Sequence, residues 1–210
     1  FACTAPDPIR FYCFNGGADY VASKFPDKKI EVKNFKLPIV EDIETTWAAP
    51  VWEEFSKQVK EDIEQGVFGT YVLDTSTEVE NVCQQATLET MKDEAEEQGR
   101  NKKRLATNEY LARNLKMRAV YDQIKDSGAN LIALQYLKEE WLKQPGEKQA
   151  LPTGKFVPDG WKRNESQCDV NVEFKKKPPI IEGGKRVIHV IATIMSSRFD
   201  DFANTITGET

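Results

Sequence analysis

The chain alternates between strand-like and helix-like stretches, and this alternation restricts its possible folds more than any other feature. Short apolar runs such as residues 9–14 and 70–73 are each followed by a stretch that suits a helix. Strands that alternate with helices favour a layered α/β fold, because parallel strands need a crossover connection between them. We therefore expect a mainly parallel sheet flanked by helices.

Local signals set the bounds of these elements. Residues 51–65 carry Trp52, Phe55 and Val59 at helical spacing with charged residues on the other face, and Gly66 is suited to end that helix. The expected helices cover residues 18–24, 51–65, 78–98 and 107–126, and the expected strands cover residues 9–14, 30–35, 70–73 and 130–135.

The pattern changes in the last third of the chain. Prolines and glycines interrupt residues 137–164, which predicts a long loop, and such a loop is uncommon in a compact domain unless it has a function. Residues 168–175 and 186–195 alternate like two strands, with a hairpin turn at residues 182–185. We expect a C-terminal antiparallel hairpin.

Bulk properties set the broad class. The 210 residues suit one α/β domain spanning 1–210, and no apolar run approaches the ~18–20 residues of a bilayer-spanning helix. Four cysteines without a C-x-x-C pair and a single histidine make a poor zinc set, so we expect buried, reduced thiols and a cytoplasmic protein without membrane contact. The net charge of −5 disfavours a protein that coats nucleic acid indiscriminately.

Asp74 ends the expected strand at residues 70–73 and is followed by Thr75 and two further hydroxyl residues. The carboxyl edge of an open parallel sheet is where α/β proteins bind ligands. Mg²⁺ prefers oxygen ligands and keeps several waters, so a carboxylate there can hold one of those waters beside nucleotide phosphates. The segment has the form of a Walker B element, although an acid in this position also serves as a turn or N-cap residue.

Gln135 ends the next expected strand, at residues 130–135, so its amide is expected at the same edge as Asp74. The long loop after it mixes cationic and aromatic side chains. This mixture suits single-stranded nucleic acid, because lysines neutralise phosphates while aromatic rings stack on bases at about 1–3 kcal/mol per base. Four acids dilute the charge, and a surface loop whose rings pack on the sheet stays an open alternative. The candidate residues are Lys138, Trp141, Lys143, Lys155, Trp161, Lys162 and Arg163.

The order of these segments resembles the RecA-like P-loop ATPases of tailed phages, AAA-domain ATP-binding proteins linked to DNA recombination and annealing. Members run a Gly-rich loop ending in Gly-Lys-Thr or Gly-Lys-Ser into a short helix, an alanine and proline turn, and a strand that leads to two glycines. Residues 1–11 match the part after Gly-Lys-Thr, and residues 15–18 match the turn after the first strand. The similarity covers most of the chain and is least specific in residues 36–66 and in the long loop.

The resemblance implies a RecA-like core that binds ATP with Mg²⁺ and acts in phage DNA recombination, annealing or replication. It implies that Asp74 holds Mg²⁺ beside Thr75 and Asn15, and that Gln135 senses the γ-phosphate. It also implies homo-oligomeric rings or filaments, single-stranded DNA as a partner, and the host cytoplasm as location. Arg198 would act as an arginine finger on a neighbour's nucleotide, with a rim salt bridge to Asp200 or Asp201 as the alternative.

Two departures from the family pattern limit these expectations. No G-x-x-x-x-G-K-[ST] motif, whose amides and lysine bind phosphates, occurs in the 210 residues. We interpret this as truncation just before Phe1, and the chain by itself would then bind ATP poorly. Asn15 stands where related proteins often carry an acid that activates the attacking water, so Asp19 or Glu78 would have to replace it.

Two other functions fit parts of the sequence. The missing loop and Asn15 favour a non-catalytic module that binds single-stranded nucleic acid or a protein partner on a P-loop-derived scaffold. A metal-dependent nuclease using Asp74, Glu78 and Asp169 is the third hypothesis. It is disfavoured because two-metal chemistry needs acids around ions about 4 Å apart, and no spacing here predicts such a cluster.

Overall fold

The computed structural model describes residues 1–38, 46–99, 101, 103–106, 109–143, 149–182 and 185–198. These residues divide into two compact units, Phe1–Trp161 and Lys162–Thr210, where the sequence predicts one domain. The physical reason is that the parallel sheet and its helices form a hydrophobic core within the first unit, and the second unit consists mainly of antiparallel ribbon.

A parallel sheet forms the centre of the first unit. The strand order is β2-β1-β3-β4, and β1 pairs with β2 and β3 while β3 also pairs with β4. Cys13 lies opposite Asp74, and Leu73 lies opposite Ala133, so the carboxyl ends of these strands share one edge. The expected mixed α/β class is confirmed. The strands are β1 (Ile9–Cys13), β2 (Ile30–Asn34), β3 (Thr70–Asp74) and β4 (Asn130–Ala133).

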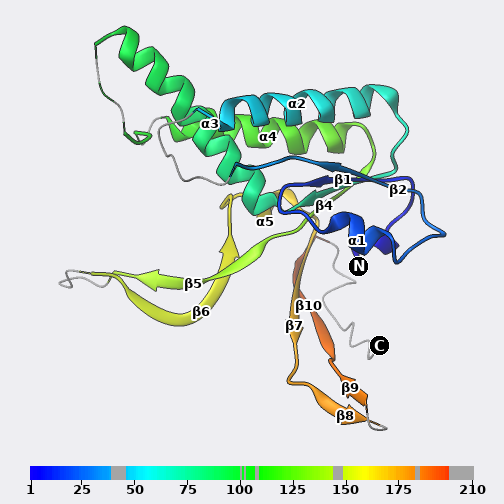
Figure 1. Ribbon diagram of the computed structural model, residues 1–210. Coiled ribbons are helices and arrows are strands. Elements are labelled where there is room, and N and C mark those ends of the chain that lie inside the picture. The colour runs from blue at the N-terminus through cyan, green and yellow to red at the C-terminus, as the bar shows by residue number, and fades with distance from the viewer. Residues whose placement is uncertain are drawn as a thin grey trace. The chain divides into compact units, whose positions relative to one another are not determined.

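Helices cover both faces of this sheet (Figure 1). Three long helices lie on one face, and a short helix lies on the other with the N-terminal 3-10 turn, η1 (Ala2–Thr4). Gly66 ends α2 in the left-handed conformation at φ 63°, as the sequence predicts. The helices are α1 (Ala18–Ala22), α2 (Ala48–Gln65), α3 (Ser76–Glu97) and α4 (Tyr110–Asp126).

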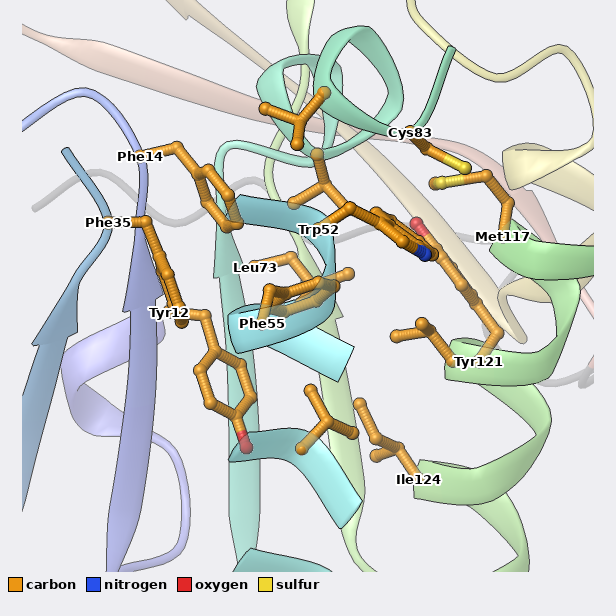
Figure 2. Packing of buried hydrophobic residues seen from close by; sticks show 14 of the residues in the cluster. Tyr12, Phe14, Phe35, Trp52, Phe55, Leu73, Cys83, Met117, Tyr121 and Ile124 are labelled. Atoms are coloured by element: carbon orange, nitrogen blue, oxygen red, sulfur yellow. The ribbon is translucent and has the colours of Figure 1, made fainter. Parts of the chain in front are cut away.

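The main core lies between the sheet and the three long helices (Figure 2). Tyr12 and Leu73 point from the sheet toward Phe55 of α2 and Tyr121 of α4, and all four side chains are at most 1% exposed. The ring of Tyr12 meets that of Phe55 edge to face with centroids 5.5 Å apart. Aromatic and aliphatic burial of this kind stabilises each side chain by about 1.5–3 kcal/mol.

A smaller core lies on the opposite face of the sheet. Ile9, Phe11 and Cys13 alternate with the residues that face the long helices, and they pack with Val72 and Cys3. Cys3, Cys13 and Cys83 are buried thiols, which agrees with the expectation, whereas Cys168 is half-buried. No helix in the described part of the chain is long and apolar enough to cross a membrane.

The expected long loop at residues 137–164 is wrong over most of its length. It forms an antiparallel hairpin of β5 (Tyr136–Leu142) and β6 (Leu151–Asp159). Both strands of a two-stranded ribbon have an open edge, so Pro152 and Pro158 fit without loss of ladder hydrogen bonds. Gly154 has φ 74° near a bulge between Glu139 and Trp141, a conformation that suits glycine.

The second unit begins with the short helix α5 (Asn164–Gln167). Strand β7 (Val170–Lys176) then pairs antiparallel with β10 (Val190–Ser197), and a small hairpin of β8 (Ile180–Glu182) and β9 (Lys185–Val187) joins them. The expected C-terminal antiparallel hairpin is confirmed. The two central residues of its predicted turn, 183 and 184, lie outside the described residues.

Candidate functional site

Asp74 lies at the carboxyl edge of the sheet, as the sequence predicts. It is the last residue of β3, which has β1 on one side and β4 on the other. The backbone of β1 continues past this point, because Phe14 N donates a 2.8 Å hydrogen bond to the Asp74 carbonyl oxygen. Strand alternation places the Asp74 side chain on the face of the smaller core, together with Val72 and Cys13.

The Asp74 carboxyl group is half-buried beside a thiol. The Cys13 Sγ lies 3.9 Å from Asp74 Oδ2 and 3.5 Å from Asn15 Oδ1. Burial raises the pKa of Asp74 above its ordinary value, and the hydrogen bond from Cys13 opposes this rise. A divalent cation beside the carboxylate would favour its ionised form.

The hydroxyl residues after Asp74 begin helix α3. The Asp74–Thr75 peptide bond is cis, and the Thr75 side chain caps the helix by accepting a 3.3 Å hydrogen bond from Glu78 N. Thr75 is only 4% exposed. Its hydroxyl therefore has a structural partner, and the predicted contact of Thr75 with a nucleotide stays a prediction.

Gln135 lies at the same edge as Asp74 but points to the other face of the sheet. It follows β4, where Ala133 packs on the main core and Leu134 packs on the smaller one. Its Nε2 donates a 3.4 Å hydrogen bond to the Asp159 carbonyl oxygen. The same Nε2 packs closely on Gly160, because a Cβ atom added to that glycine would lie only 3.0 Å from it. The structure thus brings Gln135 to the base of the β5–β6 hairpin and not beside the Asp74 carboxylate.

Asn15 belongs to the Asp74 side of the edge. Besides its contact with Cys13, its Nδ2 donates a 2.8 Å hydrogen bond to the Tyr136 hydroxyl. Of the two acids considered as replacements for it, Asp19 accepts a 2.7 Å bond from Asn34, and Glu78 accepts a 3.3 Å bond from Asn81. Neither acid has a hydrogen bond to Asn15 or Asp74, and the base for a water remains unassigned.

Some of the candidate nucleic-acid-binding side chains are exposed, and others are engaged in contacts within the protein. On the β5–β6 hairpin Trp141 is 58% exposed, and Lys155 and Lys143 are also exposed. Lys138 is on the surface too, but its Nζ forms a 2.6 Å ion pair with Asp159. Lys162 and Arg163 are exposed at the start of the second unit.

Trp161 requires a correction, because its ring belongs to the main core. The side chain is 3% exposed, its centroid lies 5.4 Å from that of Tyr121, and its Nε1 donates a 3.0 Å hydrogen bond to Asn114 Oδ1. A ring held in this way has no face for a base. Phe156, another aromatic residue of the same segment, is 65% exposed on β6 and has the exposed surface that stacking needs.

Arg198 lies in the second unit, just after β10. It forms a 3.2 Å ion pair with Asp169, and it also donates to the Ser166 carbonyl oxygen. The partners proposed for a rim salt bridge, Asp200 and Asp201, lie outside the described residues. Arg198 is exposed, and its action on a neighbouring subunit stays a prediction.

Sequence reasoning missed three residues that shape this edge: Cys13, Tyr136 and Thr77. Thr77 Oγ1 donates to the Asp159 carbonyl oxygen at 2.6 Å and accepts from Tyr136 N at 3.2 Å. Their roles depend on the β1–β3 pairing and the hairpin, which no local pattern gives. The position of Tyr136 directly after Gln135 is the one signal that could have indicated it.

Among the residues that the structure describes, no three His, Cys, Asp or Glu side chains gather to hold a metal ion. A site based on Asp74 would therefore bind Mg²⁺ together with waters and ligand oxygens, which is common for this ion. No protein-family model matches the chain, and a comparison with curated proteins found no relative.

Proposed function

We propose that this chain is the greater part of a RecA-like ATP-binding domain that acts in DNA recombination, annealing or replication. Asp74 at the carboxyl edge of β3 carries the proposal. It is a half-buried acid with a raised pKa at the position where open parallel sheets bind ligands. In this proposal its carboxylate holds a water of Mg²⁺, and Mg²⁺ neutralises the phosphates of ATP.

The proposal requires a phosphate-binding loop that the 210 residues do not contain, and the free edge of the sheet could accommodate one. Among the described strands, β4 has a partner on one side only. On the Asp74 face, Ile132 and Leu134 beside that edge are only partly buried. A preceding strand, loop and helix could pair with β4 and cover these side chains, which would place the loop's amides near Asp74.

The test is Mg²⁺-dependent ATP hydrolysis by a chain that carries a G-x-x-x-x-G-K-[ST] loop with its strand ahead of Phe1. We expect Asp74→Asn to lower kcat by at least about a hundredfold, as loss of a transition-state electrostatic contact does. Asp93→Asn, which removes an exposed acid of α3, is the matched control and should leave hydrolysis unchanged. Equal turnover in the Asp74 variant would remove Asp74 from the mechanism.

The alternative is a non-catalytic module that binds single-stranded nucleic acid. One observation favours it: the β5–β6 hairpin carries large apolar residues that are exposed, with Trp141 at 58% and Phe156 at 65%, close in sequence to Lys143 and Lys155. The two functions differ in whether nucleic-acid binding depends on ATP. Binding that is independent of ATP, with no hydrolysis in the extended chain, would favour the alternative.

A further inference from the structure

The second unit has little core of its own. Between residues 162 and 198, Asn164 is the only described residue that counts as buried, whereas Ile181 and Met195 are 73% and 62% exposed. An isolated two-stranded ribbon is at best marginally stable in water. The exposed apolar side chains of β8 and β10 are therefore accessible to another molecule.

The charge of this segment is opposite to that of the whole chain. Residues 162–198 contain eight Lys and Arg and four Asp and Glu, while the chain carries a net charge of −5. Lys175 pairs with Glu173 at 2.9 Å and Arg198 pairs with Asp169. Lys176, Lys177 and Arg186 form no ion pair with another residue whose side chain the structure describes.

One face of the ribbon combines cationic and apolar groups. Residues two apart in a strand lie on the same face, about 7 Å from each other. Residues directly opposite each other on paired strands also share a face, with their Cβ atoms about 4.5–5.5 Å apart. Phe174 and Lys176 therefore lie on the same face as Val190, which is opposite Lys176 in the register. Phe174 and Val190 are each 45% exposed. The paired charges of Glu173 and Lys175 lie on the other face.

We propose that single-stranded nucleic acid binds along this face of the β7–β10 ribbon, as a surface separate from the β5–β6 hairpin. The inference rests on the nucleic-acid partner of the proposed function and extends it to the second unit. A single strand carries phosphates that Lys176 can neutralise on this face. Lys177, which follows β7, and Arg186 of the adjoining β8–β9 hairpin can neutralise further phosphates at this end of the ribbon, and the bases can pack on the exposed apolar side chains. A folded protein partner would need an acidic surface instead.

The experiment titrates a labelled oligodeoxythymidylate with the full chain and records fluorescence anisotropy over a range of salt concentrations. The test variant is Lys176→Ala with Lys177→Ala and Arg186→Ala. Because each lost phosphate contact on a single strand lowers the salt slope by about 0.7, we expect the slope to fall by about 2 and affinity at ~0.1 M salt to fall about 10- to 100-fold. The matched control removes three exposed lysines elsewhere, Lys57, Lys60 and Lys103, and should leave the slope unchanged.

Other outcomes overturn the inference in distinguishable ways. If Trp141→Ala with Lys155→Ala abolishes binding and the ribbon variant binds like the parent chain, the ribbon proposal fails and the hairpin remains. If the parent chain binds no oligonucleotide at low salt, both nucleic-acid proposals fail. If the ribbon variant instead changes only self-association in sedimentation, the ribbon contacts a second copy, whose residues 46–99 hold thirteen acids and three lysines.

Discussion

A buried ion pair ties β1 to α2. Arg10 donates from two nitrogens to Asp62, each at 2.7 Å, and the Tyr12 hydroxyl donates to the same carboxylate at 2.9 Å. Asp62 is fully buried, and the Arg10 guanidinium lies 4.6 Å from the ring centroid of Phe68. Burial alone would raise the pKa of Asp62, but the hydrogen bonds from Arg10, Tyr12 and Gln58 outweigh it and lower the pKa.

Asp62→Asn should destabilise the protein by about 1–3 kcal/mol, because the partly buried Arg10 guanidinium then keeps only its ion pair with the exposed Glu31. Since the pKa of Asp62 is lower in the folded than in the unfolded state, its stabilisation is complete above about pH 4 and is lost as pH falls through the folded pKa. Urea denaturation at pH 7 and in acid measures both effects. Glu64→Gln on the exposed face of α2 is the control, with a change below about 0.5 kcal/mol. If Asp62→Asn left the free energy of unfolding unchanged, this role of Asp62 would be contradicted.

The elements of the parallel sheet could be predicted, because buried strands and amphipathic helices have distinct patterns. The sequence does not predict toward which face of the sheet each residue at the carboxyl edge points. In β3, Tyr71, Val72 and Leu73 are all buried, so apolar side chains occupy both faces and alternation carries no information. For the same reason the sequence predicts Asp74 and Gln135 together at one edge but not their opposite faces. The β5–β6 hairpin was missed because its prolines and glycine are typical of loops.

The Thr77 side chain of helix α3 forms two hydrogen bonds with the base of the β5–β6 hairpin. We expect Thr77→Val to destabilise the protein by about 1–3 kcal/mol, because it leaves the Asp159 carbonyl and the Tyr136 amide without this partner. Hydrogen exchange at Tyr136 N should also become faster. Thr90→Val on the same helix loses only a bond to its own turn and should change stability by less than about 0.5 kcal/mol. Equal effects of the two substitutions would exclude Thr77 as an anchor of the hairpin.

The two units of the molecule differ in their charge and in the candidate functional groups that they carry. The first unit contains the packed sheet with the half-buried Asp74, and the second unit presents a basic ribbon. The sequence predicts the C-terminal hairpin and its lysines, but it does not predict that the Trp161 ring packs against Tyr121 at the end of the first unit. Such long-range packing has no local sequence signal, and the same limit explains why Trp161 was expected on the surface.

The central claim is that Asp74 binds a divalent ion with nucleotide at the carboxyl edge of β3. Mn²⁺ accepts the oxygen ligands that Mg²⁺ does and broadens the NMR signals of nearby amides, so Mn²⁺ with ATP reports the position of the site even when binding is weak. We predict broadening at residues 13–17 and 74–77, little effect at the amino ends of the strands near Ile9 and Thr70, and loss of the broadening in Asp74→Asn. Broadening centred elsewhere, or unchanged in Asp74→Asn, would contradict the claim.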